Sequence, residues 1–182
     1  MFNQQRKSYI EIGNVYFFTA TINNWFNLLA EDSYKQVIID SLTYLNDSNK
    51  MSIFGFVIMP NHIHLILQTH QMNGKETVQG AFLKYTAHAF KKMLALNSPT
   101  FLEKFSVIAD NKKYEFWQRD SLAFQLTKKE TAIQKLNYIH NNPVSKKWHL
   151  SETPESYHYS SAEFYKSNVA NFSFLSHLMD VF

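Results

Sequence analysis

The chain reads SIFGFVIMPNHIHLILQT over residues 52–69, and this stretch decides the fold. Residues 52–59 and 62–69 are each long enough for a strand and are rich in apolar and β-branched side chains. Only Pro60 and Asn61 separate them, and so short a link favours an antiparallel hairpin. The sequence therefore predicts two neighbouring antiparallel strands.

The second of these strands begins with His62-Ile63-His64. Residues i and i+2 of a strand point to the same face, so we expect the two imidazoles side by side, with Ile63 and Leu65 facing the other way. Two neutral imidazoles held in parallel supply half of a site for a divalent metal ion. The alternative is a pair of surface histidines on a half-buried strand. The tripeptide alone leaves both interpretations open, because two ligands do not complete a site.

Strand and helix patterns alternate on either side of the hairpin. Residues 15–22 are rich in aromatic and β-branched residues and predict a first strand. Ser33 and Gln36 have capping-box spacing and predict the start of a helix. After the hairpin, a second long helix is predicted from an apolar stripe at helical spacing, formed by Val78, Phe82, Tyr85, Ala89, Met93 and Leu96.

A fourth strand is predicted from residues 114–118 and 122–126, kinked around Arg119-Asp120. The order of elements is then strand, helix, strand, strand, helix, strand, helix. This order predicts an α+β fold with a ferredoxin-like antiparallel sheet, helices on one face and an additional C-terminal helix. The other face of the sheet is left free for function.

The composition indicates a single folded domain. The 182 residues, 45% of them hydrophobic, suffice for a substantial core, which we place at about 8–147 with a C-terminal tail over 148–182. There is no cysteine, so a metal site must use His, Asn, Gln, Asp or Glu. The N-terminal residues 1–7 are polar, and no apolar run is long enough for a membrane span. We therefore expect a soluble, cytoplasmic protein with no membrane partner.

The net charge of +3 is compatible with a nucleic-acid partner without establishing one. Of the 18 basic residues only Arg6 and Arg119 are arginine. Bidentate reading of guanine edges favours arginine, whereas lysine provides point charges for phosphates. Any DNA contact is thus expected to depend on backbone charge, base stacking and nucleic-acid shape.

The last predicted helix carries a second polar motif. Thr127 and Glu130 have capping-box spacing at its start, and Pro143 ends it. Its apolar face is predicted from Ile133, Leu136 and Ile139, while a different face carries Gln134, Tyr138 and Asn142. A tyrosine and an amide oxygen are thus presented together. Pro143 disfavours helical geometry at Asn142, the residue before it, so the direction of the Asn142 side chain is left open. The alternative is a half-buried tyrosine in a helix that Asn142-Pro143 simply stops.

Taken together, these motifs resemble a known family. His62, His64 and Tyr138, in this order on a strand and a late helix, resemble the HUH single-tyrosine nucleases. Within that group, Met59-Pro60-Asn61-His62-Ile63-His64 and Tyr138-Ile139-His140-Asn141-Asn142-Pro143-Val144 look like the REP-associated tyrosine transposases. Two further segments are similar, Phe116-Trp117-Gln118-Arg119 and Tyr157-His158-Tyr159-Ser160-Ser161. The resemblance runs from about residue 8 to 166.

The resemblance implies a metal-dependent DNA nickase and strand transferase. It makes Tyr138 the nucleophile and His62, His64 and Asn142 the ligands of Mg²⁺ or Mn²⁺, with imidazole and amide oxygen suiting Mn²⁺ rather better. The implied product is a covalent 5′-phosphotyrosine with a free 3′-hydroxyl, which can rejoin strands without ATP. One departure is Ala123-Phe124, where relatives often carry an acidic residue followed by histidine. An auxiliary role of that pair is therefore not carried over.

The implied partner is single-stranded or hairpin DNA with REP-like inverted repeats, in a bacterial cytoplasm with its nucleoid. Candidate contacts to this DNA are Lys84, Lys91, Lys92, Trp117 and Arg119. For each lysine alone, a solvated surface charge is the simpler explanation. The tail from Trp148 to Tyr165 suits either hairpin recognition or packing against the sheet. Because some single-tyrosine relatives exchange the tyrosine helix between subunits, action of Tyr138 in cis and in trans both stay open. The tail resembles that of the relatives and favours a monomer over a dimer.

Two other classes of function compete with this one. A hairpin-binding host protein that no longer cuts DNA would keep the same fold, but the intact residues His62, His64, Tyr138 and Asn142 argue against it. A phosphohydrolase acting through metal-bound water needs more carboxylates near the histidines than the sequence offers. Phosphoesterases with two His-x-Thr/Ser motifs are also disfavoured, because only one His-x-His occurs.

Overall fold

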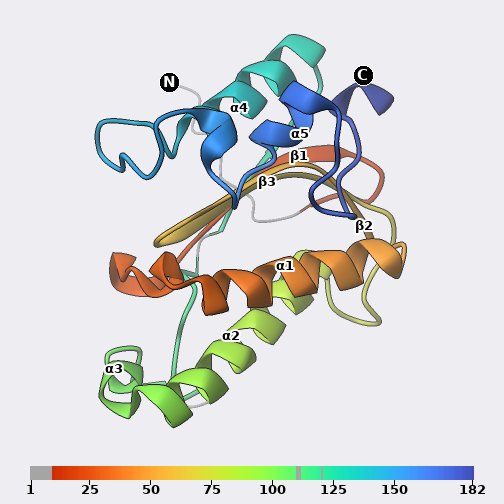
Figure 1. Cartoon of the computed structure of the whole chain (residues 1–182). Coiled ribbons are helices and arrows are strands. Elements are labelled where there is room, and N and C mark those ends of the chain that lie inside the picture. Colours follow the sequence, from red (N-terminus) through yellow and green to blue (C-terminus); the bar gives the residue numbers. More distant parts are fainter. Residues whose placement is uncertain (1–9, 110–111, 120) are drawn as a thin grey trace, which may run out of the picture.

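The strands form one four-stranded antiparallel sheet in the order β2-β3-β1-β4 (Figure 1). The structure, a computed structural model, describes residues 10–109, 112–119 and 121–182. The strands are β1 (Val15–Thr21), β2 (Met51–Met59), β3 (His62–Thr69) and β4 (Leu122–Gln125). The helices are α1 (Asp32–Asp47), α2 (Val78–Asn97), α3 (Pro99–Glu103), α4 (Lys129–Asn141) and α5 (Ala162–Ser167). The predicted ferredoxin-like fold with an additional helix is confirmed.

The predicted hairpin lies in the middle of this sheet. Met59 pairs with His62 across the turn, so β2 and β3 are joined by Pro60 and Asn61 alone. On its other side β3 pairs with β1, which places Thr19 opposite His64. Because β3 is hydrogen-bonded on both edges, its register and the direction of every side chain on it are fixed.

Side chains of β3 alternate between two separate layers of core. Ile63 and Leu65 are fully buried on the face covered by α1 and α2, as the period of two predicts. Ile66 lies in a second cluster on the opposite face, together with Leu136 and Ile139 of α4. Figure 1 shows the two layers, with α1 and α2 on one side of the sheet and α4 and α5 on the other. Helix α4, the last helix that the sequence predicts, thus folds back across the face of the sheet that was expected to be free.

Both predicted capping boxes are wrong. Helix α1 begins at Asp32 with Glu31 as its N-cap, and α4 begins at Lys129 with Lys128 as its N-cap; neither cap makes a side-chain hydrogen bond. At α1 the chain enters from a short 3₁₀ helix, Leu28–Ala30, so the helix starts one residue before the predicted Ser33 cap. An acidic residue in each first turn interacts favourably with the helix dipole instead.

The buried stripe of α2 differs from the predicted one. Tyr85 and Leu96 are 58% and 76% exposed, whereas Thr86 and Phe90 are fully buried. The buried positions are Val78, Gln79, Phe82, Thr86, Phe90 and Leu94. Thr86 turns inward because its hydroxyl donates to the Phe82 carbonyl and accepts from Trp117. A polar residue therefore takes a place that hydrophobicity alone assigns to Tyr85. In α4, likewise, Ala132 is buried and the predicted Ile133 is 38% exposed.

Only the second half of the predicted fourth strand is a strand. Residues 122–125 pair with β1, while residues 114–118 make two isolated bridges, from Trp117 to Ile22 and from Tyr114 to Ser106. The side chain of Trp117 is buried between this segment and α2, which turns the chain away from regular pairing. Asp120 of the predicted kink and the N-terminal residues 1–9 lie outside the described residues.

The C-terminal tail covers the outer edge of β2. The backbone N–H of Ile58 donates to the carbonyl of Tyr159 at 2.9 Å, and the N–H of Ser161 donates to the carbonyl of Phe56 at 3.0 Å. The hydroxyl of Tyr157 donates to the Ile58 carbonyl at 2.8 Å. An open edge strand is prone to pair with other chains, and the tail removes this edge. Tyr157 and Tyr159 thus take the packing role predicted for the tail, and hairpin recognition by the tail stays a prediction.

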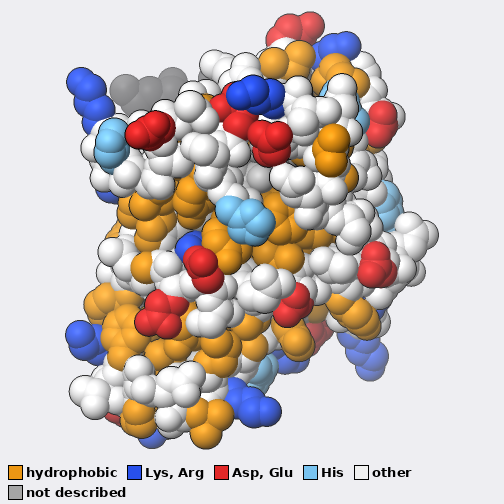
Figure 2. All heavy atoms as spheres, in the orientation of Figure 1, with side chains coloured by type: hydrophobic (Ala, Val, Ile, Leu, Met, Phe, Trp, Pro, Cys, Tyr) orange, Lys and Arg blue, Asp and Glu red, His pale blue; other side chains and the backbone are white. Residues whose placement is uncertain are grey.

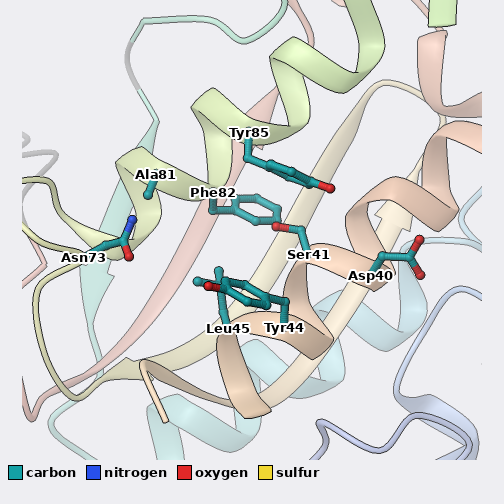
Figure 3. Close-up of a pocket in the computed structure, with 8 residues that line it drawn as sticks. All are labelled: Asp40, Ser41, Tyr44, Leu45, Asn73, Ala81, Phe82 and Tyr85. Carbon is teal, nitrogen blue, oxygen red and sulfur yellow. The ribbon is translucent and has the colours of Figure 1, made fainter. Parts of the chain in front are cut away.

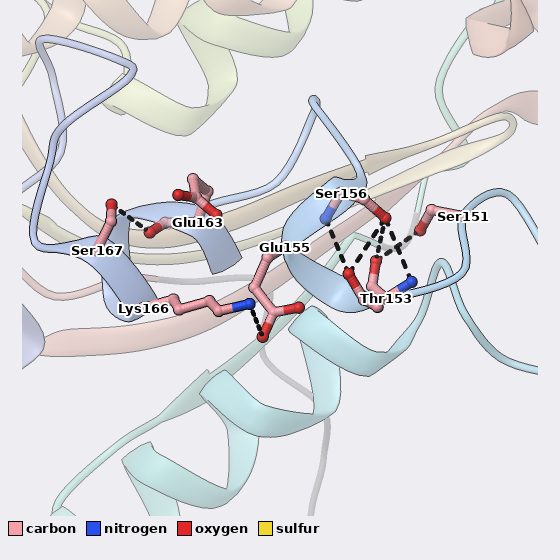
Figure 4. Close-up of polar contacts among 7 residues, drawn as sticks. All are labelled: Ser151, Thr153, Glu155, Ser156, Glu163, Lys166 and Ser167. Carbon is pink, nitrogen blue, oxygen red and sulfur yellow. Dashed lines mark hydrogen bonds and ion pairs between the residues drawn. The ribbon is translucent and has the colours of Figure 1, made fainter.

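Polar contacts within the tail hold the segment that connects α4 to α5 (Figure 4). Thr153 and Ser156 form a capping box around the 3₁₀ helix Pro154–Ser156. The Nζ of Lys166 on α5 lies 3.7 Å from the carboxylate of Glu155 in that short helix. An exposed ion pair of this kind contributes little to stability, because water and salt screen it. The backbone pairing with β2 is therefore the main anchor of the tail.

Gly55 allows α4 to approach β2 closely, and we expect its substitution to be costly. A Cβ on Gly55 would lie 2.6 Å from Leu136 Cδ1 and 3.2 Å from Ile139 Cδ1. Gly55→Ala should lower the free energy of unfolding by about 1–3 kcal/mol through overpacking, measured by urea denaturation. Adding Leu136→Val to this variant should recover part of the loss, because it removes the clashing methyl. Equal stability of Gly55→Ala and wild type would contradict the close approach.

Candidate active site

The two histidines of β3 lie on the face of the sheet that α4 covers. His62 and His64 are 8% and 6% exposed, and their ring centroids are 4.8 Å apart. The prediction that they share a face is confirmed, and the alternative of two surface histidines is wrong. The expectation of parallel rings is also wrong, because the angle between the two ring planes is 74°. The burial arises because α4 and Trp148, which follows it, close over the end of the hairpin.

Each imidazole is oriented through its Nδ1 atom. Nδ1 of His64 lies 2.7 Å from the hydroxyl of Thr19, its partner across the sheet. Nδ1 of His62 lies 2.7 Å from Oδ1 of Asn61, which can only accept, so this nitrogen carries the proton. A metal-binding histidine usually makes a hydrogen bond through one ring nitrogen, which fixes the ring, and binds the metal through the lone pair of the other.

Nε2 of His64 is buried and has no hydrogen-bond partner among the described residues. A buried polar atom left unpaired costs about 1–3 kcal/mol, so such atoms in native proteins call for an explanation. A divalent cation held by the lone pair of this nitrogen would provide one. The chemistry of the donors fits: two oriented imidazoles, together with the amide oxygen predicted from Asn142, would suit Mg²⁺ or, better, Mn²⁺.

Burial keeps both imidazoles neutral. It lowers the pKa of His62 to about 4, with a smaller contribution from the charge of Lys147. It lowers the pKa of His64 to about 3, assisted by His62 and Lys135. Neutral imidazole is the form that binds a metal, so at pH 7 no proton has to leave before binding.

These lowered pKa values predict a loss of stability in acid. Burial also lowers the pKa of His140 to about 4. The folded state resists protonation of all three histidines, whereas the unfolded chain accepts protons below about pH 6.5. Stability is therefore retained above pH 6.5 and lost as the pH falls toward 4. At pH 5 the loss is about 2 kcal/mol per histidine.

Urea denaturation with a metal chelator present, from pH 7.5 to 5, measures this loss. A His64→Leu variant should lose about a third less stability between pH 6.5 and 5 than the wild type, because one of three buried titrating groups is gone. A free energy of unfolding that stays constant over this range would contradict the prediction.

Tyr138 faces the histidine pair from α4. Its ring centroid is 5.5 Å from that of His64 and 6.2 Å from that of Phe17. The side chain is nevertheless 53% exposed, so a macromolecule can reach it. Leu136 and Ile139 on the buried side of the helix fix this orientation by packing on β2. The structure thus brings together three residues that the sequence separates by seventy-six positions.

Asn142 lies one helical turn beyond Tyr138, at the C-cap of α4. Its φ of −60° and ψ of −47° are helical, so the expected disturbance before Pro143 is absent and the residue stays on the same side as Tyr138. Its side chain is half-buried. Over the described part of the chain, no group of three or more His, Asp or Glu side chains could hold a metal. A third protein ligand would have to be an amide or hydroxyl, and Asn142 remains the predicted one.

Two lysines beside the site were not predicted from the sequence. Nζ of Lys135 lies 4.9 Å from the ring centroid of Phe17 and 5.8 Å from that of Tyr138. Nζ of Lys147 lies 5.0 Å from the ring centroid of Trp148, which in turn packs 5.8 Å from His62. Lys135 could have been found, since it precedes Tyr138 by one helical turn. Lys147 follows the helix, and nothing in the sequence indicates where it lies.

The predicted DNA contacts do not gather around this site. Lys84, Lys91 and Lys92 are exposed on α2, which covers the opposite face of the sheet. The prediction that Trp117 stacks on bases is wrong, because this side chain is 6% exposed and its indole N–H donates to Thr86. Arg119 is exposed but pairs with Glu115 at 3.0 Å.

Two grooves also lie on the far layer. One, of about 440 Å³, lies between α1 and α2 and is flanked by the exposed rings of Tyr44 and Tyr85 (Figure 3). The other, of about 610 Å³, lies between α2 and residues 112–116 and is lined by Lys84, Lys91, Lys112 and Lys113. Neither is lined by the histidines of β3 or by Tyr138, so neither belongs to the candidate active site.

The fold is shared with a solved transposase. One similar structure is a REP-associated tyrosine transposase bound to a REP hairpin, with a TM-score of 0.61, 16% identity, and coverage of 93% of this chain and 90% of the other. A second, with a TM-score of 0.42 and 17% identity, is a candidate transposase from Deinococcus radiodurans R1; it covers 74% of this chain and 94% of the other. The chain matches no protein-family profile and no curated protein.

At this identity the likeness concerns the fold alone. The chain has the fold of the REP-associated tyrosine transposases, as the motif resemblance predicts. Within the described residues, no helix is long and apolar enough to cross a membrane.

Proposed function

We propose that this protein is a metal-dependent nickase and strand transferase acting on single-stranded or hairpin DNA through a covalent 5′-phosphotyrosine. The observation that carries the proposal is the pair of buried, neutral imidazoles on one face of the sheet, next to an exposed tyrosine of the helix that covers this face. A buried Nε2 without a partner accompanies them on His64.

In this proposal His62, His64 and Asn142 hold the metal ion. The bound ion supplies Lewis-acid polarisation of the scissile phosphate and neutralises its charge. Asn61 and Thr19 orient the two imidazoles through Nδ1, so the ligands are positioned before the metal arrives. The low pKa values keep these ligands available throughout the neutral range.

Tyr138 provides the nucleophile. Its phenolic oxygen attacks phosphorus and loses its proton to solvent, while the bond from phosphorus to the 3′-oxygen breaks and that oxygen gains a proton. The tyrosine then carries the 5′-phosphate, and a 3′-hydroxyl can later attack this ester and release the phenol. Lys135 lies beside the ring and favours the negative charge that develops on the phenolic oxygen and the phosphate.

The proposed substrate class is supported by the fold and by local charge. A solved protein of the same fold is bound to a REP hairpin. On the face that Figure 2 shows, acidic and basic side chains are interspersed, so no continuous basic surface covers it. At the site itself, Lys135 and Lys147 are the cations beside the aromatic rings, and they would attract a phosphate backbone.

A labelled-hairpin assay tests the proposal. The protein is incubated with Mn²⁺ and hairpin oligonucleotides carrying single-stranded flanks, and the products are separated under denaturing conditions. With a 3′ label the signal should move to a covalent protein adduct, because the protein keeps the 5′-phosphate of the downstream fragment. With a 5′ label a shorter free fragment ending in a 3′-hydroxyl should appear. Both should vanish with chelator, whereas hairpin binding without either product would identify a protein that no longer cuts DNA.

A further inference from the structure

Trp25 is an exposed tryptophan held in an unusual backbone conformation. Asn24 and Trp25 have φ angles of 55° and 56°. These values lie in the left-handed region, which residues other than glycine rarely adopt. Asparagine tolerates this region, but tryptophan does not favour it. The indole is 57% exposed, so burial in the core does not compensate for the strain. Strained residues that the fold nonetheless holds in place are concentrated at ligand-binding sites.

A buried amide links this turn to the candidate metal site. The side-chain N–H of Asn61 donates to the carbonyl of Trp25 at 3.2 Å, and its Oδ1 accepts from Nδ1 of His62 at 2.7 Å. Asn61 is itself 6% exposed. The position of Trp25 is therefore coupled to the orientation of His62 through a single side chain.

A cation and a second indole complete the surface. Nζ of Lys147 lies 5.9 Å from the ring centroid of Trp25 and 5.0 Å from that of Trp148. Trp148 is half-buried and packs beside His62 with 5.8 Å between centroids. Lys147 forms no ion pair with any residue that the structure describes. Two indoles with an unpaired ammonium group between them match the alternation of base and phosphate in an unpaired strand.

We propose that Trp25, Lys147 and Trp148 form a nucleotide subsite next to the candidate metal site. An unpaired base in the single-stranded flank of the DNA stacks on the Trp25 indole, and a neighbouring phosphate lies against Lys147. The subsite rests on the proposed function, because it fixes the flank that leads to the scissile phosphate. It recognises a π-face and a charge, so it requires an unpaired nucleotide at this position without selecting among bases.

Binding of a hairpin with 2-aminopurine in its single-stranded flank tests the subsite. Measurements are made in chelator, so that cleavage does not contribute. Stacking should quench 2-aminopurine at one flank position with the wild type and not with Trp25→Ala. The affinity of Trp25→Ala for the flanked hairpin should fall about tenfold, while Trp25→Phe retains most of it. Lys147→Gln should reduce the salt slope of binding by about one counterion.

The matched control is Tyr85→Ala, which removes an aromatic ring of nearly equal exposure, 58%, from α2 on the opposite layer. It should bind as the wild type does, and a blunt hairpin without a flank should not distinguish Trp25→Ala from wild type. Circular dichroism melts verify that the variants are folded. Wild-type affinity and quenching in Trp25→Ala would overturn the subsite and leave the proposed function standing. Failure of the wild type to bind any hairpin or flank would overturn both.

Discussion

Tyr138→Phe is expected to abolish the covalent protein–DNA adduct, with a loss of at least about a thousandfold in its rate of formation. The substitution removes only the attacking oxygen. The ring keeps its edge contacts with His64 and Phe17. The lost hydroxyl belongs to a side chain that is 53% exposed, so the free energy of unfolding should change by less than about 0.5 kcal/mol. Adduct yield with 3′-labelled hairpin and hairpin affinity by anisotropy are the two measurements.

The control for this substitution is Tyr85→Phe. Tyr85 is 58% exposed, so the same hydroxyl is removed from a tyrosine of similar exposure on α2. Tyr85→Phe should form adduct at the wild-type rate, and Tyr138→Phe should still bind the hairpin. An adduct that persists in Tyr138→Phe would show that another residue is the nucleophile.

His64→Leu is expected to remove the stabilisation of the protein by Mn²⁺ without lowering its stability in chelator. In the wild type, Mn²⁺ at a hundred times its dissociation constant should raise the free energy of unfolding by about 2.7 kcal/mol. Leucine fills a similar volume and leaves no unpaired nitrogen where Nε2 of His64 is now buried. The partner hydroxyl of Thr19 is only half-buried, so water can satisfy it. Urea denaturation with and without Mn²⁺ measures both effects.

His88→Leu is the control for this variant, because it removes an exposed histidine from α2. It should keep the full response to Mn²⁺. Adduct formation by His64→Leu should fall at least about a hundredfold, in line with the loss of a metal ligand. A response to Mn²⁺ that survives His64→Leu would place the metal elsewhere. No response in the wild type would contradict the proposed metal site itself.

Features of the site that depend on local periodicity could be predicted from the sequence. The period of two on β3 places His62 and His64 on one face, and their shared face follows without knowledge of any other element. The spacing of four places Tyr138 and Asn142 on one side of α4 in the same way. The Pro60-Asn61 link is short enough to permit only an antiparallel neighbour. These relations are set within one element or one turn.

Contacts between distant segments could not be predicted. Gly55 of β2 carries no signal in the sequence that Leu136 will approach it, yet this contact seats α4 above the histidines. Trp117 and Trp25 look alike in the sequence, because each lies between a phenylalanine and an amide residue. The first is buried because Thr86 and Phe90 of α2 meet it, and the second is exposed because a left-handed turn holds it outward.

The sequence by itself therefore determined the strand hairpin, the shared face of the two imidazoles and the helix face that carries the tyrosine. Only the tertiary structure decided that the histidine face of β3 meets the tyrosine face of α4. It also decided that Nε2 of His64 is buried without a partner among the described residues, and that Lys135 and Lys147 lie beside the site. The physical reason is the range of the interactions. Backbone geometry fixes the direction of side chains within an element, whereas burial and charge at the site arise from packing between elements far apart in the chain.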